Sequence, residues 1–418
     1  MNSQSRPPVG AAGKSSLGVA EACRIIHAKL KPVRGWERVS VRNALGRVLA
    51  ADVIAPCNVP AHDNSAMDGY AVRFADLAAD GETALSVVGT AFAGQPFTGI
   101  VSAGQAARIM TGAPIPSGAD TIVVQEVARS DGARVHIPAG QQAGQNLRRA
   151  GEDLAAGSVA IAAGRRCGSA ELGLIASLGI AEVTVYRRLR VAFFSTGDEL
   201  ASIGKPLGPG EVYDSNRYTL FAELTRLGCE LLDMGVVRDD PAALEAAFRS
   251  AADNADVIVT SGGVSVGEAD FIRELVNRLG EVAFWKIDIK PGRPMAFGHI
   301  GGAWMFGLPG NPVAVLVTYY QFVRDALLRL SGVTPLPAAP SFLVPCGEAI
   351  AKRPGRREYL RGRLTTEDGR QRVTLAGAQG SGILKSMSEA NCFIVLPEDC
   401  GDVAAGTPVL VQPFEGLF

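Results

Sequence analysis

The chain has 418 residues, and its 41 Lys and Arg against 42 Asp and Glu give a formal net charge of -1. Such a balanced charge excludes a protein that is basic overall and binds nucleic acid or an acidic membrane through a long-range field. At roughly 150 residues per domain, this length predicts about three domains. No window approaches the roughly 18 uncharged apolar residues that a membrane-spanning helix needs.

The first 16 residues are polar and lack the apolar centre of a signal peptide, so we expect a flexible tail and a cytoplasmic protein. The seven cysteines are scattered without a CxxC pair, and the four histidines are equally dispersed. This pattern indicates neither a disulfide framework nor a Cys/His zinc site. Any metal is therefore expected to use carboxylates, which suits a hard cation such as Mg²⁺.

Apolar residues at helical spacing predict an amphipathic helix over residues 17–30 and a short helical stretch within 39–53. From about residue 72 to 150, the pattern changes to short apolar runs broken by glycine, proline and aspartate, which predict β-strands. Helical spacing returns at 169–180. A β-rich segment between two helical segments predicts one domain that is interrupted by another.

From residue 190 to 331, apolar strands alternate with helices of about a dozen residues. This alternation predicts a parallel sheet that is covered by helices on both faces and binds ligands at the carboxyl ends of its strands. A linker rich in proline and small residues follows at 331–341. The short β-like runs beyond the linker predict a small C-terminal β-barrel.

The predicted fold class is therefore α/β and multidomain, with a central parallel-sheet α/β domain, an interrupted mixed domain, an inserted β-rich domain and a C-terminal β-barrel. No internal repeat or low-complexity tract is present. The predicted boundaries are 1–16 for the tail, 17–57 and 146–185 for the interrupted domain, 58–145 for the inserted domain, 186–332 for the α/β domain and 333–418 for the barrel.

A glycine-rich segment, TSGGVSVGEAD, follows an apolar strand of the α/β region and opens a helix. Gly262 and Gly263 let the backbone turn tightly, and Ser261 and Ser265 add hydroxyl donors. The helix N-terminus adds positive potential, so the segment predicts a site for a phosphate or another oxyanion. A turn that serves only to pack the helix on the strand is the alternative.

A second segment, GLPGNP, is placed in the same way after the next predicted strand. Asn311 is expected to cap the following helix, and Pro312 to take its first position, where a missing N–H does no harm. Capping alone would explain these two residues. With Pro309 and Gly310, however, a second amide-lined helix start beside the first could hold the other end of an elongated anionic ligand.

The stretch WKIDIKPGRP concentrates positive charge in a chain that has few lysines. On a strand, side chains alternate, so Lys286, Asp288 and Lys290 are expected to share one face. With Arg293 following, they predict a compact cationic cluster that fits tetrahedral oxyanions. A solvated edge strand is the alternative.

Carboxylates recur after successive predicted strands of the α/β region. Side chains at these strand ends can converge on Mg²⁺ bound to a phosphate. Taken singly, such residues are more often helix caps, which is the default expectation for Asp214, Ser215 and Asp240. The remaining candidates are Asp198, Glu199, Asp239 and Asp270.

Three polar segments are rich in turn-forming residues, namely PAHDNSAMDGYAVR, IMTGAPIP and NLRRAGEDL. Their composition fits ordinary surface loops and functional loops equally well. Asp68, Thr111 and Asp153 are among the residues that could have a function.

Seven motifs occur here in the order seen in the molybdopterin molybdenumtransferases, the molybdenum insertase family that includes bacterial enzymes and the E domain of gephyrin: PAHDNSAMDGYAV, MTGAPIPSGADTIVVQE, NLRRAGEDL, STGDEL, SGGVSVGEAD, KPGRP and GLPGNPV. The resemblance runs from about residue 17 to the C-terminus. It implies a four-part subunit and an elongated homodimer whose site is shared between protomers. It also implies that molybdate is inserted into adenylylated molybdopterin with release of AMP and a requirement for Mg²⁺, which yields molybdenum cofactor.

The resemblance assigns functional roles to matching positions: Asp68, Thr111, Asp153, Glu199, Asp239, Asp270, Lys286, Lys290, Pro309, Pro312, Arg361 and Ser381. The basic and hydroxyl members suit binding of molybdate or the pterin phosphate, namely Lys286, Lys290, Arg361 and Ser381. The acidic members that suit placing the metal and a water are Glu199, Asp239 and Asp270. The chain departs from the family at Asp288, where a small or basic residue is more frequent, and a carboxylate there is expected to weaken anion binding.

Two other functions fit parts of the sequence. Molybdopterin adenylyltransferase activity resides on a related α/β domain with a similar SGGxS loop, although the extra domains here argue against it. A non-catalytic scaffold of the gephyrin type is the other, although no added interaction domain or long linker is present. The expected partners are a second copy of the chain, molybdopterin adenylyltransferase and molybdoenzyme maturation factors, with no nucleic acid and no membrane.

Overall fold

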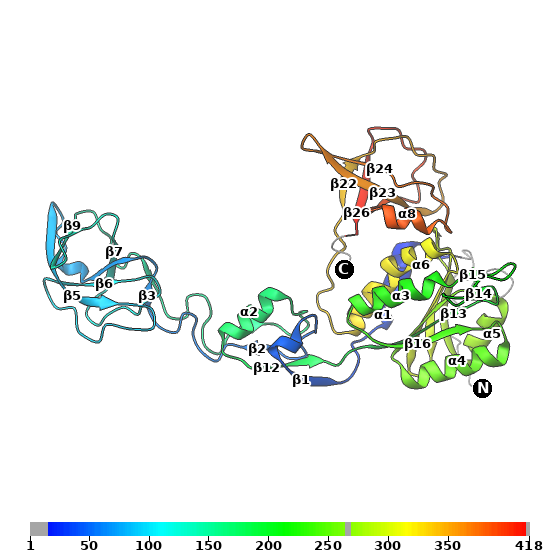
Figure 1. Cartoon of the computed structure of the whole chain (residues 1–418), viewed down its shortest axis with the longest axis horizontal. Helices are drawn as coiled ribbons and strands as arrows, with labels where there is room; N and C mark the ends of the chain where they lie inside the picture. Colours follow the sequence, from blue (N-terminus) through cyan, green and yellow to red (C-terminus); the bar gives the residue numbers. More distant parts are fainter. Residues whose placement is uncertain (1–15, 264–268, 415–418) are drawn as a thin grey trace, which may run out of the picture.

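The computed structural model describes residues 16–263 and 269–414. Figure 1 shows an elongated molecule with a small β-rich lobe at one end and an α/β lobe at the other. We call these the inserted lobe and the α/β lobe. A middle lobe around α2 (Ser169–Ser177) connects them, and a C-terminal lobe adjoins the α/β lobe. None of the helices in the described residues is long and apolar enough to cross a membrane.

The α/β lobe is built on a six-stranded sheet with the strand order β16-β13-β17-β21-β20-β18. Its strands are β13 (Arg190–Thr196), β16 (Glu230–Val237), β17 (Val257–Ser261), β18 (Gly280–Lys286), β20 (Pro294–Ile300) and β21 (Ala303–Leu308). A small parallel pair, β14 (Leu200–Ala201) and β15 (Val212–Tyr213), lies beyond β13.

This sheet is mixed, so the prediction of an all-parallel sheet is wrong. Strands β16, β13, β17 and β21 run parallel, but β20 runs antiparallel to both β21 and β18. Gly301 and Gly302 are the two residues between β20 and β21. Such a short turn joins antiparallel strands, because parallel neighbours need a long crossover connection.

Helices cover both faces of the sheet, as predicted. The first apolar core includes residues of α1 (Val19–Lys29), α3 (Ser215–Arg226), α6 (Pro312–Thr318) and α7 (Arg324–Leu330), and a π-helical segment, η3 (Tyr319–Val323), joins the last two. The second core includes residues of α4 (Pro241–Asn254) and α5 (Ala269–Leu279). On β13, Phe193 enters the first core and Phe194 the second, because successive side chains of a strand point to opposite faces.

The middle lobe holds α2 and two strand pairs, β1 (Trp36–Ser40) with β12 (Glu182–Tyr186) and β2 (Val53–Ile54) with β11 (Val159–Ile161). The helical stretch predicted within 39–53 is only a 3₁₀ helix, η1 (Val41–Ala44), because the chain turns at Gly46 with a left-handed φ of 74°. The helix predicted over 17–30 is α1, and it packs on the α/β lobe.

The inserted lobe contains a six-stranded sheet with the order β7-β4-β6-β5-β9-β8. Its strands are β4 (Gly69–Val72), β5 (Glu82–Ala91), β6 (Gln105–Ile109), β7 (Thr121–Val124), β8 (Arg129–Ser130) and β9 (Arg134–Pro138), with a 3₁₀ helix, η2 (Phe74–Asp76), after β4. A separate pair of strands, β3 (Asn64–Ser65) and β10 (Leu147–Arg148), adjoins this sheet.

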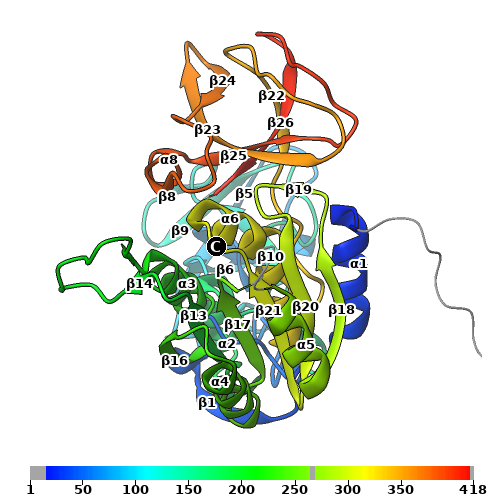
Figure 2. The ribbon, with the colours of Figure 1, turned by 90° about the vertical axis from the view of Figure 1, so that its right-hand side faces the viewer.

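The C-terminal lobe lies above the α6 end of the α/β lobe in Figure 2. Its strands are β22 (Phe342–Pro345), β23 (Arg357–Glu367), β24 (Arg370–Leu375), β25 (Cys392–Leu396) and β26 (Pro408–Pro413), with α8 (Leu384–Glu389) between β24 and β25. The sheet order is β19-β23-β25-β26-β22, where β19 (Ile289–Lys290) comes from the segment after β18, and β24 pairs with β23. In the described part of the chain, an isolated bridge from Cys346 to Val373 links the β22 end to β24, so a closed barrel stays a prediction.

Candidate active site

A cleft of about 390 Å³ lies between the α/β lobe and the C-terminal lobe, and we call it the interlobe cleft. This volume is in the range of sites for small ligands. Three segments line the cleft: the loop from β19 (Ile289–Lys290) to β20, the loop from β21 to α6, and the part of the C-terminal lobe around Arg361. The sequence-predicted site residues that meet here are Lys290, Arg293, Pro309, Asn311, Arg361 and Ser381.

Lys290 is held at the cleft by a buried carboxylate. The strand β19 pairs in parallel with the start of β23, which sets Lys290 beside Glu358. The Lys290 Nζ atom lies 3.1 Å from Oε2 of Glu358, whose side chain is only 6% exposed while that of Lys290 is 51% exposed. The ammonium group is therefore anchored on one side and open to a ligand on the other. Sequence reasoning missed Glu358, because only the pairing of two lobes brings it to the lysine.

Lys286 and Lys290 do not share a strand face, so that prediction is wrong. Lys286 ends β18 in the α/β lobe, whereas Lys290 belongs to a strand of the C-terminal sheet. Between them, the backbone N–H of Asp288 donates to the carbonyl of Leu17 at 2.7 Å, and the Asp288 carboxylate accepts from the Ser16 hydroxyl. Pairing with this N-terminal segment interrupts the strand, and Lys286 lines a different cleft with Ser16.

Arg361 is a fully buried cation without a carboxylate among its hydrogen-bond partners in the described residues. Its Nε donates to the Ser386 hydroxyl at 3.0 Å, and its Nη2 donates to the carbonyls of Ala378 and Gly380 at 3.1 and 3.0 Å. Its Nη1 has no hydrogen-bond partner in the part of the chain that the structure describes. Burial lowers the pKa of Arg361 to about 10, so the group remains charged at neutral pH.

A buried charge is costly unless it is paired, so an anion in the interlobe cleft would complete the environment of Arg361. The loop around it is well fixed, because the Gln379 side chain bonds the backbone N–H and the carbonyl of Arg361 at 2.8 and 3.1 Å. Ser381 is half-buried beside it, and its carbonyl accepts from the N–H of Val313 in the first turn of α6 at 3.0 Å. The C-terminal lobe is thereby tied to the start of α6.

The two predicted anion loops are connected by Asn216 in the first turn of α3. Its Nδ2 donates to the hydroxyl of Ser261 at 2.8 Å and to the carbonyl of Gly310 at 2.6 Å. Gly262 has a left-handed φ of 91°, and a Cβ atom there would lie 2.3 Å from the carbonyl oxygen of Thr196, so only glycine fits. Asn216 escaped sequence reasoning, because YDSNRY is typical of an ordinary helix start.

Three buried polar atoms near these loops have no hydrogen-bond partner within the described residues: Thr196 Oγ1, Asp214 Oδ2 and Asn216 Oδ1. Buried polar groups are normally paired, so these atoms are suited to a polar ligand. Pro312 takes the first position of α6 as expected, whereas Asn311 is at the cap position but makes no side-chain capping bond. The predicted Ser265 and the side chain of Asp270 lie outside the described residues.

The carboxylates after the strands have two different roles. Asp214 accepts from the N–H of Arg217 at 3.1 Å, and Asp240 accepts from that of Ala243 at 2.9 Å, so both cap helices as expected. The exposed Glu199 lies in the turn after β13. Asp239 donates its N–H to Asp198 Oδ1 at 3.4 Å, which joins the loops that follow β13 and β16. Among the described residues, no group of three or more acidic, His or Cys side chains is arranged to hold a metal.

Three further predicted residues, Asp68, Thr111 and Asp153, lie outside the α/β lobe and the C-terminal lobe. Asp68 and Thr111 are in the inserted lobe, where the Asp68 carboxylate accepts hydrogen bonds from Thr111. Asp153 is exposed and donates its N–H to the carbonyl of Val59 at 3.1 Å. Figure 1 shows that the inserted lobe is far from β13 and α6, so one chain does not bring the two groups of residues together.

The fold and the site together define an α/β protein suited to phosphate-like anions. It has helices on both faces of a sheet, two connected loops at the carboxyl ends of the parallel strands, and a cleft with a buried cation.

Three family models match the chain. Residues 17–179 match the MoeA N-terminal region (domain I and II), residues 192–329 a probable molybdopterin binding domain, and residues 344–414 the MoeA C-terminal region (domain IV).

Several proteins are similar to this one over nearly the whole chain. The molybdopterin molybdenumtransferase of Haemophilus influenzae is 45% identical over 383 residues, which cover 91% of this chain and 94% of the relative. The molybdopterin molybdenumtransferase of a Nostoc species is 38% identical, and the alignment covers 92% of this chain and 90% of the relative. The molybdopterin biosynthesis MoeA protein of Pyrococcus horikoshii OT3 aligns over 96% of this chain and all of its own at a TM-score of 0.82 and 27% identity. The chain belongs to the molybdopterin molybdenumtransferase family.

Proposed function

We propose that this protein inserts molybdate into adenylylated molybdopterin and releases AMP, which completes the molybdenum cofactor. Family membership supports the transferase activity. The observation that carries the proposal is Arg361, a buried guanidinium with an unpaired Nη1 in a cleft that also contains Lys290 and Ser381. Charged and hydroxyl donors of this kind suit a small tetrahedral oxyanion such as molybdate.

The pterin substrate would bind along the adjoining loops. Its phosphate suits the backbone of Gly262 and Gly263 and the start of α6. The unpartnered acceptors Asp214 Oδ2 and Asn216 Oδ1 suit N–H groups of the pterin ring. Asn216 holds the two loops together, so it would position both ends of the substrate relative to the interlobe cleft.

We include Mg²⁺ in the proposal, held by Glu199, Asp239 and Asp270. Carboxylate oxygens are the ligands that Mg²⁺ prefers, and Glu199 and Asp239 follow neighbouring strands of the sheet. When bound, the ion would neutralise negative charge on the phosphoanhydride of the substrate. Glu199 and Asp239 would then orient the phosphate region at the edge of the sheet.

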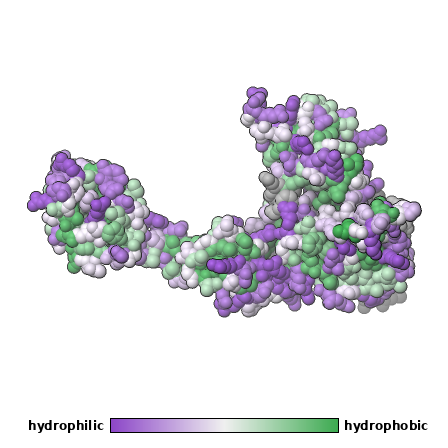
Figure 3. Space-filling model, in the orientation of Figure 1, coloured by the Kyte–Doolittle hydropathy of each residue, from purple (hydrophilic) through white to green (hydrophobic). Residues whose placement is uncertain are grey.

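The site is proposed to be shared between the protomers of a homodimer. Asp68 and Thr111 cannot reach Lys290 and Arg361 in one chain, so a partner's inserted lobe would have to supply them. Hydrophilic and hydrophobic residues are interspersed over the face in Figure 3. Large exposed apolar side chains nevertheless concentrate on α3 and the segment before it, which offers a surface for a second copy. They are Ile203, Leu207, Val212, Tyr213, Tyr218 and Phe221.

The remaining expectations belong to the same proposal. They are a cytoplasmic location, a closed C-terminal barrel, and contacts with molybdopterin adenylyltransferase and molybdoenzyme maturation factors. The contact with adenylyltransferase is reasonable because that enzyme supplies the adenylylated substrate.

The proposal is tested with purified protein, adenylylated molybdopterin, molybdate and Mg²⁺. We expect AMP release that depends on molybdate, together with active cofactor measured by reconstitution of a molybdoenzyme. Absence of AMP would contradict the proposal. ATP-dependent adenylylation of molybdopterin by this chain alone would favour the adenylyltransferase alternative, and cofactor synthesis in cells by an Arg361→Met variant that releases no AMP would favour a scaffold.

A further inference from the structure

The joint between the middle lobe and the α/β lobe contains two adjacent crossing segments. One leads from α1 to β1 through Arg34 and Gly35, and the other leads from β12 to β13 through Arg187. The backbone N–H of Arg187 donates to the carbonyl of Gly35 at 3.2 Å, which links the segments. The apolar packing at the joint is a small cluster around Val48, Leu328 and Val333. So little apolar contact leaves a large share of the stiffness to polar contacts.

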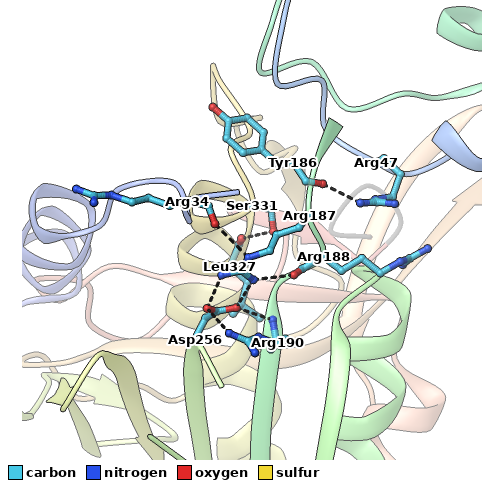
Figure 4. A network of polar contacts seen from close by, with 9 residues as sticks. All are labelled: Arg34, Arg47, Tyr186, Arg187, Arg188, Arg190, Asp256, Leu327 and Ser331. Carbon is cyan, nitrogen blue, oxygen red and sulfur yellow. Dashed lines mark hydrogen bonds and ion pairs between the residues drawn. The ribbon is translucent and has the colours of Figure 1, made fainter. Parts of the chain in front are cut away.

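Arg187 connects both crossing segments to the α/β lobe, as Figure 4 shows. Its Nη1 and Nη2 each donate to a carboxylate oxygen of Asp256 at 2.7 Å, and its Nε donates to the carbonyl of Arg34 at 3.1 Å. Asp256 immediately precedes β17, and its carboxylate also accepts from the backbone N–H of Arg190 at 2.8 Å, at the start of β13. A two-point contact between a guanidinium and a carboxylate fixes orientation as well as distance.

We propose that Arg187 and Asp256 form a positioning pair for the reaction. They fix the angle at which the middle and inserted lobes, together called the arm, leave the α/β lobe. The inference rests on the proposed shared site, because Asp68 and Thr111 of the inserted lobe would have to enter the partner's site. The middle lobe separates the inserted lobe from the α/β lobe (Figure 1), so a small rotation at the joint is amplified in the inserted lobe.

The first test compares Arg187→Ala with Arg190→Ala in the full-length dimer. Arg190 also faces Asp256, with its Nη2 at 3.8 Å, but both residues belong to the α/β lobe, so the control loses charge without loosening the arm. Misplacement of reacting groups by about 1 Å can cost on the order of 100-fold in rate. We therefore expect Arg187→Ala to lower kcat/KM for AMP release about 10- to 100-fold and Arg190→Ala to change it less than about threefold.

The decisive test uses mixed dimers, made by coexpression of two variants with different affinity tags. If the site is shared, a dimer of Asp68→Ala and Lys290→Ala protomers retains one intact site and recovers about half of the wild-type activity. If this reference dimer recovered no activity, the proposal of a shared site would be contradicted, whatever the role of Arg187. Its success allows the positioning pair to be judged separately.

In the shared arrangement, the arm of one protomer enters the site of its partner. A protomer with a loose arm therefore impairs only the partner's site. Arg187→Ala should therefore restore activity when mixed with Lys290→Ala and should not do so when mixed with Asp68→Ala. Asp256→Asn keeps the shape of the side chain and should behave in the same way, although Asp256 lies in the α/β lobe. If Asp256 only stabilised its own α/β lobe, Asp256→Asn would instead restore activity with Asp68→Ala and not with Lys290→Ala. That pattern, or no restoration with either partner, would overturn the proposal.

Discussion

The carboxylate of Asp68 accepts two hydrogen bonds from Thr111, one from its backbone N–H at 2.7 Å and one from its hydroxyl at 2.8 Å. Asp68 immediately precedes β4, whereas Thr111 lies just beyond β6, the antiparallel neighbour of β4. These hydrogen bonds lower the pKa of Asp68 below its ordinary value of 3.8. The two residues therefore present one fixed, negatively charged group in the inserted lobe.

Thr111→Val removes the hydroxyl donor and keeps the backbone donor and the shape of the side chain. The pKa of Asp68 should rise toward 3.8 but remain below it, because the stronger contribution, from the backbone N–H, persists. We expect kcat/KM for AMP release to fall about three- to tenfold, as for loss of one ordinary hydrogen bond, because Asp68 is partly exposed to solvent. Carbon-13 NMR titration of the aspartate carboxyls measures the pKa. The exposed Thr366→Val serves as the control, and equal activities of the two variants would contradict a role for the hydroxyl.

Lys290→Ala should affect both binding and stability. It removes a donor to the anion, so molybdate affinity measured by calorimetry should fall about 10-fold or more. It also leaves the buried Glu358 without its cation, which should cost about 1–2 kcal/mol, since half of the lysine side chain is solvated.

The double variant Lys290→Ala/Glu358→Gln separates these two effects. Removing the stranded carboxylate should restore most of the stability and none of the molybdate affinity. Lys286→Ala should weaken molybdate binding less than Lys290→Ala, because Lys286 lines a different cleft. Equal losses of affinity in the two lysine variants would contradict the structural assignment of the oxyanion to the interlobe cleft.

Arg361→Lys keeps the charge but cannot keep the geometry. A lysine ammonium cannot reproduce the forked contacts to Ser386, Ala378 and Gly380 while also presenting a donor to a ligand. We expect a loss of about 2–4 kcal/mol in the free energy of unfolding and at least about a 10-fold loss of molybdate affinity. Arg363→Lys is the matched control, since Arg363 is two positions along the same strand and exposed. A molybdate affinity in Arg361→Lys equal to that of the control would count against the site.

The alternation of strands and helices could be predicted from sequence, because buried strands are continuous apolar runs whereas the helices have apolar residues at helical spacing. The direction of β20 could not, because a strand that is buried on both faces has the same apolar run in either direction. The path from Lys286 to Lys290 is a different failure. Alternation along a strand holds only while the strand continues, and contacts of Asp288 with a segment 271 residues earlier end it (288 minus 17).

The backbone of the candidate site could be predicted where a motif contains the glycine or proline that its turn requires. Gly262 and Pro312 occupy the positions that their special backbones require. Glu358 and Asn216 were missed because each acquires its role from a neighbour in another segment. Arg361 came from the family resemblance alone, since complete burial of an arginine has no signature in sequence.

The ion pair of Asp256 should make the joint sensitive to acid. Burial by itself would raise the pKa of Asp256, but hydrogen bonds and charge from Arg187, with a contribution from Arg190, outweigh burial and hold the pKa below 3.8. A carboxylate with a lowered folded-state pKa stabilises the fold fully above its unfolded-state pKa, and this contribution is lost as the pH falls through the folded-state value. Asp256→Asn should therefore cost roughly 1–3 kcal/mol at pH 7.

The cost of Asp256→Asn should stay constant down to about pH 5 and shrink below about pH 4, where the carboxylate begins to take up a proton in the unfolded wild-type chain before it does so in the folded one. Urea unfolding of the two proteins over this pH range measures the difference. Asp253→Asn, an exposed position on α4, should show a small difference that does not depend on the ion pair. A cost for Asp256→Asn that persists unchanged at pH 3 would mean that the cost does not come from the negative charge of the carboxylate. In that case, Arg187 would no longer be its functional partner.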